Sequence, residues 1–225
     1  MIELGAHFTP SRAINISLQI HALALAMFHR VAEITGAENI CIAGGFLRGL
    51  YMQQFLGLAP KMNDVDIFAD MSIEEFNAVR HKLEYEFGTH SRILVGNFES
   101  EEHPCGLIEF LLPENRREQC AGAQSIQLNF GFSHPWAIPY EYIQQANIGM
   151  NQIAMRQDGT VIASQAFLDD MTDKTMTMNT NRTWLLADWI RTNKKMETMK
   201  NDRPEFKGWA IIQTPKPIVP ITGSF

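Results

Sequence analysis

Two stretches decide the fold that the sequence predicts: residues 42–48, Ile-Ala-Gly-Gly-Phe-Leu-Arg, and residues 61–68, Lys-Met-Asn-Asp-Val-Asp-Ile-Phe. In an extended strand, side chains two residues apart point to the same face, so we expect Asp64 and Asp66 to stand side by side. Two adjacent carboxylates repel each other unless a positive charge lies between them. Mg²⁺ meets this need, because it prefers oxygen ligands and takes one or two protein carboxylates plus substrate phosphates.

The glycine pair Gly44-Gly45 lies between an expected strand at residues 39–43, whose residues 40–43 are apolar, and a segment of helical composition, residues 45–56. A chain without Cβ atoms can bring its N–H groups against a phosphate, and a helix N-terminus favours an anion. A tight turn with no ligand is the alternative interpretation. Together with the acid pair, the glycines predict a phosphate-and-metal site divided between two strands.

Length and composition set the class of protein. The 225 residues are enough to bury a substantial core, and the net charge is −6. No apolar run approaches the length of a membrane span, and the first residues lack the features of a signal peptide, so we expect a cytoplasmic protein without a membrane partner. The three cysteines, Cys41, Cys105 and Cys120, form no Cys-x-x-Cys pair, which favours buried thiols over a disulfide framework or a zinc site.

The charges are unevenly distributed. Residues 180–207 contain seven Lys or Arg and four Asp or Glu, and residues 180–200 have the composition of a helix. This basic segment could touch a polyanion such as a nucleic acid. A solvated helix face is the alternative, and no aromatic or glycine interleaving accompanies the charges.

Other segments complete the expected α+β fold (α/β in looser usage). We expect a helix over residues 11–34 after the N-cap Thr9-Pro10, a second helix that a capping box opens at Ser72, a polar loop at 113–119, and an extended or disordered tail after Lys207. The sheet is expected to be small and mixed, with helices on one face.

Glu109 interrupts an otherwise apolar strand, residues 106–112. A lone ionised group in such a run costs free energy unless it is paired or bound to a cation. An exposed edge strand would also explain it. The small mixed sheet is expected to contain all three acids, Asp64, Asp66 and Glu109.

The motif Gly44-Gly45-x-x-Arg48, followed about twenty positions later by Asp64-x-Asp66 and then by a strand with one more acid, resembles the nucleotidyltransferase superfamily that includes DNA polymerase β. It is more closely similar to the catalytic head of the CCA-adding tRNA nucleotidyltransferases and bacterial poly(A) polymerases. Residues 150–159 (MNQIAMRQDG) and 167–174 (FLDDMTDK) strengthen the resemblance, which spans roughly residues 38–178.

The resemblance implies a reaction in which a hydroxyl attacks the α-phosphorus of an NTP and pyrophosphate leaves. Mg²⁺ or Mn²⁺ would be the cofactor, and the acceptor hydroxyl could belong to an RNA 3′ end, a protein or a small molecule. The oligomeric state stays open. By the same resemblance, Asp64, Asp66 and Glu109 are the catalytic, metal-binding acids, and Gly44, Gly45, Arg48 and Asn151 bind the nucleotide.

The sequence also departs from this family. Gly49 stands where the family usually has an aspartate, and residues 145–147, Gln-Ala-Asn, replace an Arg-Arg-Asp motif. These changes favour, as the alternative, an inactive module that keeps the fold and binds nucleotides or a partner. We expect a catalytic domain over residues 1–178 and a helical arm with a proline-containing tail over 179–225.

Overall fold

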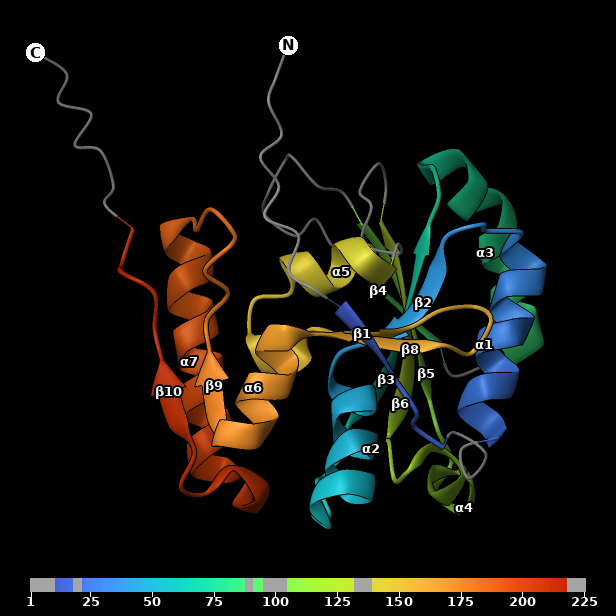
Figure 1. Ribbon diagram of the computed structural model, residues 1–225. Coiled ribbons are helices and arrows are strands. Elements are labelled where there is room, and N and C mark those ends of the chain that lie inside the picture. The colour runs from blue at the N-terminus through green and yellow to red at the C-terminus, as the bar shows by residue number, and fades with distance from the viewer. Residues whose placement is uncertain (1–10, 18–21, 88–90, 95–104, 132–138, 218–225) are drawn as a thin grey trace, which may run out of the picture.

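The computed structural model describes residues 11–17, 22–87, 91–94, 105–131 and 139–217. Within them, a mixed eight-stranded sheet has the order β1-β8-β7-β2-β3-β6-β5-β4 (Figure 1). Its neighbouring strands are antiparallel except β3 and β6, which are parallel. The α+β class is confirmed, but the sheet is larger than predicted. The strands are β1 Ser11–Ile14, β2 Ile40–Ala43, β3 Asp64–Asp70, β4 Ser91–Leu94, β5 Cys105–Leu111, β6 Ser125–Gly131, β7 Ile153–Met155 and β8 Val161–Ser164.

The helices include the predicted one after the glycine pair and the one that the capping box opens. Ser72 Oγ accepts a hydrogen bond from the Glu75 N–H (3.2 Å), and Glu75 Oε2 accepts one from the Ser72 N–H (2.7 Å), which confirms that capping box. No helix in the described ranges has both the length and the hydrophobicity needed to cross a membrane. The helices are α1 Ala22–Thr35, α2 Gly45–Leu56, α3 Ile73–Phe87, α4 Glu114–Arg117, α5 Pro139–Gln145, α6 Gln165–Asp173 and α7 Leu186–Asp202, with short 3₁₀ turns η2 Glu118–Cys120, η4 Gly149–Asn151 and η5 Pro204–Phe206.

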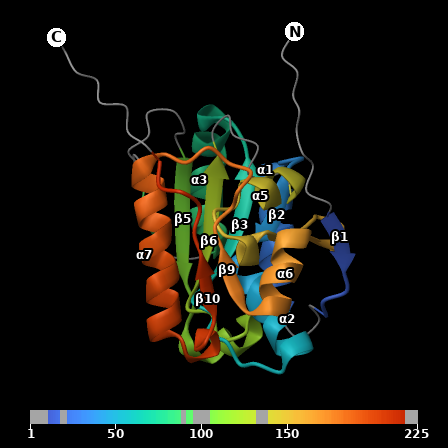
Figure 2. The same ribbon diagram turned by 60° about the vertical axis from the view of Figure 1, so that its left-hand side comes forward.

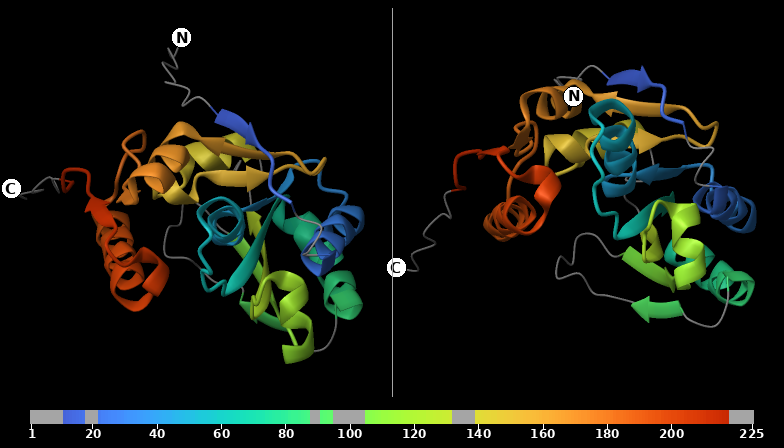
Figure 3. Two further views of the ribbon diagram at one scale, coloured as in Figure 1. Left: turned by 60° about the horizontal axis from the view of Figure 1, so that its bottom comes forward. Right: turned by 90° about the horizontal axis from the view of Figure 1, so that it is seen from below.

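The sheet is covered on both faces. All four residues of β2 are buried, and because side chains alternate along a strand, Ile40 and Ile42 face one side while Cys41 and Ala43 face the other. The first side holds the large core, and Figure 3 shows α1 and α3 there. On the second side, Ile143 of α5 packs in a smaller cluster with Cys41 and Ala43, and α7 also lies on this side (Figure 3). The prediction that helices cover one face only is therefore wrong.

Two predicted segments fold differently from the sequence expectation. Residues 11–14 form β1, which pairs antiparallel with β8, so the predicted helix over 11–34 begins only at Ala22. The edge strand β8 offers unpaired backbone groups, and pairing with them outweighs the helical pattern of this short segment. The predicted N-cap, Thr9-Pro10, lies outside the described residues. The predicted loop at 113–119 contains α4 and part of η2.

The C-terminal segment packs against the body. The strand β10 (Ala210–Ile212) pairs in parallel with β9 (Thr175–Thr177), and Figure 2 shows this pair between α6 and α7. Phe206 and Trp209 are buried, with ring centroids 5.1 Å apart in an edge contact. Of the two predicted states of the tail after Lys207, extended or disordered, residues 210–212 adopt the extended one, because these apolar contacts and the strand pairing fix them. A domain boundary at residue 178 stays a prediction.

Candidate active site

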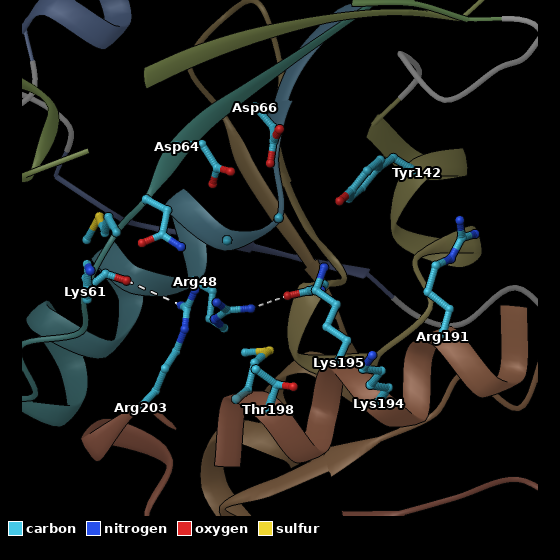
Figure 4. Close-up of a pocket in the computed structure, with 16 residues that line it drawn as sticks. Arg48, Lys61, Asp64, Asp66, Tyr142, Arg191, Lys194, Lys195, Thr198 and Arg203 are labelled. Carbon is cyan, nitrogen blue, oxygen red and sulfur yellow. Dashed lines mark hydrogen bonds between the residues drawn. The ribbon is translucent and has the colours of Figure 1, made fainter. Parts of the chain in front are cut away.

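A cavity of about 510 Å³ lies between β3, the start of α2 and α7 (Figure 4). It brings together six of the seven predicted site residues, although they come from segments far apart in sequence: Gly44, Gly45, Arg48, Asp64, Asp66 and Asn151. The cavity also contains residues that the sequence did not suggest for the site, among them Lys61, Tyr142, Arg191, Lys194, Lys195, Thr198 and Arg203.

The acid pair lies on the face of β3 that α5 covers only in part. Asp64 and Asp66 are both partly buried, and they share their face with Phe68, which packs against Tyr142 with ring centroids 5.0 Å apart. The side-chain amide of Asn129, on β6, donates to Asp66 Oδ1 (3.3 Å). Burial, together with the charge of Asp64, raises the pKa of Asp66 to about 7.

This acid pair fits a divalent cation that prefers oxygen ligands. The raised pKa of Asp66 reports an unfavourable negative charge, which a cation between the two carboxylates would relieve. Asp64 and Asp66 are the residues that would hold it, with substrate phosphates completing its ligands. Such an ion would polarise a phosphoryl oxygen and stabilise the charge that develops during phosphoryl transfer.

Glu109 is not brought together with the acid pair. Asp66 on β3 pairs in register with Gln127 on β6, which pairs with Glu109 on β5. Glu109 therefore lies two strands away, about 10 Å at the usual strand spacing, and its Oε1 accepts from the Gln127 amide (3.3 Å). No three His, Cys, Asp or Glu side chains of the described residues are grouped to hold a metal ion. A role for Glu109 in the site stays a prediction.

The glycine turn differs in one respect from the prediction that both N–H groups bind phosphate. Gly44 has φ 75° and ψ −129°, and its N–H donates to the Ile153 carbonyl (3.0 Å), so that N–H is already used. The N–H of Gly45, the first residue of α2, makes no backbone hydrogen bond within the described ranges. Gly45 and the positive end of the α2 dipole are thus the elements of the turn that could bind an anion.

Replacing Gly44 with alanine is expected to lower the free energy of unfolding by about 2–3 kcal/mol. Its backbone conformation suits glycine, and an added Cβ would lie 2.8 Å from the Tyr142 hydroxyl oxygen. Urea unfolding measures the change. Gly36→Ala is the control, since Gly36 has φ +63° but open space around it; an equal loss in both variants would contradict a steric conflict with Tyr142.

Arg48 is an unusual buried cation beside the turn. Its side chain is on α2 and only 6 % exposed. One terminal nitrogen donates to Asn151 Oδ1, and the guanidinium lies over the Phe206 ring, 5.4 Å from its centroid. Burial, and next the charge of Arg203, lower its pKa to about 10. Its Nε has no hydrogen-bond partner among the described residues, and an unsatisfied buried donor costs free energy, so this residue indicates an anionic ligand.

The helix α7 supplies a cationic wall. Arg191, Lys194, Lys195 and Thr198 follow the i, i+3, i+4, i+7 spacing of one helix face, and all four line the cavity. These side chains are solvent-exposed, as the alternative prediction of a solvated helix face requires. The face that they form also lines the cavity. Protein around Lys195 displaces enough water to lower its pKa, while Asp66 and Asp64 act in the opposite direction. The basic charge of residues 180–207 suggests contact with a polyanion, but sequence reasoning did not place these residues at the site, although their spacing was a signal for it.

The positions that depart from the family pattern have local explanations. A Cβ at Gly49 would lie 2.7 Å from Met62 Cε, so Met62 fills the space beside this glycine. Asn147, the last residue of the Gln-Ala-Asn segment, accepts from Arg182 through Oδ1 and donates to Thr192 Oγ1 of α7 (3.0 Å). This segment therefore helps to attach α7 to the body.

Comparison with solved structures shows that the chain has a nucleotidyltransferase-like fold. Among the similar structures are CCA-adding enzymes. One in complex with ATP has a TM-score of 0.52 and 13 % identity, covering 90 % of this chain and 43 % of its own. The Bacillus stearothermophilus CCA-adding enzyme in complex with CTP has a TM-score of 0.51 and 13 % identity, covering 88 % and 41 %.

The chain thus spans less than half the length of these solved structures. No protein-family model matches it, and no curated protein sequence does. At such low identity the likeness defines the fold alone.

Proposed function

We propose that the chain is a metal-dependent nucleotidyltransferase that transfers NMP from an NTP to a hydroxyl acceptor and releases pyrophosphate. One observation supports this most strongly: a single cavity contains the acid pair of β3, the N-terminus of α2 and six cationic side chains, which are Arg48, Lys61, Arg191, Lys194, Lys195 and Arg203. A triphosphate with a divalent cation has the complementary pattern of charge.

The roles of the residues follow from their charges. Asp64 and Asp66 would hold Mg²⁺ or Mn²⁺. The Gly45 N–H and Arg48 would bind phosphate oxygens, since fixed donors aimed at developing negative charge stabilise phosphoryl transfer. The cations of α7 face the cavity from the opposite side, where they would neutralise the charge on the departing pyrophosphate. The acceptor hydroxyl attacks the α-phosphorus while the bond to the bridging oxygen breaks.

The acceptor is proposed only as a class. The part of α7 that lines the cavity carries three cations beside Thr198 and Met199, and a polyanionic acceptor such as an RNA 3′ end suits this charge. The complexes with ATP, CTP and tRNA among the similar structures describe what those proteins bind. For this chain, an RNA acceptor is a proposal.

Label transfer tests the function. The purified chain is incubated with each α-³²P-labelled NTP, Mg²⁺ or Mn²⁺, and pools of RNA, protein and small-molecule acceptors. We expect label in one acceptor pool, lost in the double variant Asp64→Asn with Asp66→Asn and kept in Asp70→Asn, which alters an acid farther along β3. Absence of label from every pool, or label that survives the double substitution, contradicts the proposal.

A second function has its own supporting observation. The strand next to the acid pair, β6, presents the amides Gln127 and Asn129 on the active-site face, and Glu109 is held by Gln127. An inactive nucleotide-binding module would keep the cavity without a third acid. Thermal stabilisation by an NTP with no pyrophosphate release would favour this module, whereas pyrophosphate release that depends on Asp66 would exclude it.

A further inference from the structure

Tyr142 is a cavity residue that neither the acid motif nor the glycine motif includes. It lies on α5, and its ring is fixed on one side by Phe68 and belongs to the cluster around Ile143 and Ala43. Figure 4 shows its hydroxyl end directed toward the cavity. A ring held in this way places its hydroxyl with little loss of side-chain entropy on ligand binding.

The hydroxyl is close to the glycine turn. A Cβ built on Gly44 would be 2.8 Å from the hydroxyl oxygen, so only a glycine lets the two approach. Within the described part of the chain, no protein group forms a hydrogen bond with this hydroxyl. A phenol usually finds a partner when it is largely buried, so the free hydroxyl beside the turn indicates a ligand atom at this place.

Other groups at the same place identify the ligand as an anion. Gly45, in the same cavity, is the first residue of α2, and the N-terminus of a helix favours an anion. Arg48 also lines this cavity, is only 6 % exposed, and its Nε has no partner among the described residues. Burial, and next the charge of Asp66, raise the pKa of Tyr142. The phenol therefore keeps its proton at neutral pH and can act as a donor.

We propose that the Tyr142 hydroxyl donates a hydrogen bond to the phosphate chain of the nucleotide at the glycine turn. Tyr142, the Gly45 N–H and Arg48 thus form one phosphate-binding cradle contributed by two helices, α2 and α5. The inference rests on the proposed function for the identity of the ligand as an NTP, but the cradle itself needs only a polyphosphate.

The test measures binding rather than turnover. Isothermal titration calorimetry compares wild type with Tyr142→Phe, using inorganic tripolyphosphate and α,β-methylene ATP as probes, each with Mg²⁺. A hydrogen bond to a charged group is worth roughly 10-fold or more in affinity, so we expect Tyr142→Phe to bind both probes about 10-fold more weakly. Tyr140→Phe is the matched control, because Tyr140 is on the same helix, is 43 % exposed and does not line this cavity.

The outcomes separate the two proposals. Equal affinity of Tyr142→Phe and wild type, with the same unfolding temperature, overturns the role of Tyr142. Loss of affinity for the ATP analogue alone also overturns it, because a contact to the phosphates must affect tripolyphosphate as well. If wild type binds tripolyphosphate through Tyr142 but transfers no label, the cradle stands and the proposed transferase activity fails.

One result would reverse the role of the residue. If wild type incubated with ATP carries an AMP adduct on Tyr142 by mass spectrometry, the hydroxyl is an acceptor rather than a donor to the phosphates, and the proposal is overturned. We expect no adduct, because the ring is fixed by its packing against Phe68 and its hydroxyl is directed at the turn.

Discussion

Asp66→Asn is expected to reduce nucleotidyl transfer by about 1000-fold or more, and also to stabilise the folded protein at pH 8. The loss of activity follows from removing one of two carboxylates that would hold the cation and from the large electrostatic share of phosphoryl-transfer catalysis. The gain in stability follows from the raised pKa of Asp66. On the proposed function, catalysis would require a charge that the fold disfavours.

The sign of the pH dependence follows from proton linkage. The pKa of Asp66 is about 7 in the folded chain, against about 3.9 in an unfolded chain. Between these values the folded state holds a proton that the unfolded state releases, so the stability is full below pH 4 and falls as the pH rises through 7. At about 1.4 kcal/mol for each pH unit in the window, the wild-type protein loses up to about 4 kcal/mol.

Urea unfolding at pH 5 and pH 8 in EDTA measures this effect. By the same linkage wild type has already lost about 1.5 kcal/mol at pH 5, so Asp66→Asn should exceed it by about 1.5 kcal/mol at pH 5 and by about 4 kcal/mol at pH 8. Asp70→Asn is the control, since Asp70 lies on the same strand and face, two pairs of residues from Asp66, and should leave the wild-type pH dependence unchanged. A variant Asp66→Asn that is less stable than wild type at pH 8 would show that the charge is not disfavoured.

Asp170→Ala is expected to lower the free energy of unfolding by about 3 kcal/mol. Asp170, on α6, is 1 % exposed. Its carboxylate accepts from Thr175 Oγ1 (2.6 Å), Thr177 Oγ1 (2.7 Å) and the Thr177 N–H (3.1 Å). Truncation leaves these donors without an acceptor, and a buried unsatisfied donor costs more than the net value of the bond it has lost.

The same substitution should weaken nucleotide binding. Asp170 ties α6 to β9, and β9 pairs with β10, which follows α7 in the chain; Figure 1 shows these elements side by side. Loosening β9 therefore loosens the support of the cationic wall. Urea unfolding and tripolyphosphate titration measure the two effects.

Asp169→Ala is the matched control for this prediction. Asp169 is exposed and accepts from Gln165 Nε2 (2.8 Å), so its loss should cost less than about 0.5 kcal/mol. Equal effects of the two aspartates would contradict a structural role for the buried one.

Local chemistry made much of the site predictable. A strand, a glycine pair and a helix were read from residues 39–56, and the alternation of Asp64 and Asp66 along β3 placed both acids on one face. The glycine turn and the acid pair were predictable because their geometry is set within a few residues. The family resemblance assigned Arg48 and Asn151 separately to nucleotide binding, but only the structure shows their hydrogen bond, which joins residues 103 positions apart.

Other features required the tertiary structure. The sequence could not show that β6 lies between β3 and β5, because strand order depends on long-range packing, and this order separates Glu109 from Asp66. Nor could it show that Tyr142 meets Gly44, a contact that exists only once α5 packs over β2. The sequence pattern likewise predicts helix at residues 11–14. These residues form a strand because they pair with β8, and this pairing is a tertiary interaction that the local pattern does not encode.

The sequence by itself determined the class of the fold and the paired acids that follow a glycine turn, because strand alternation and glycine conformation are local properties. The tertiary structure alone decided what faces those acids. It brought the cations of α7 and the hydroxyl of Tyr142 to the cavity, since the docking of a helix onto a sheet is fixed by the buried apolar surface between them and not by the charged residues it delivers.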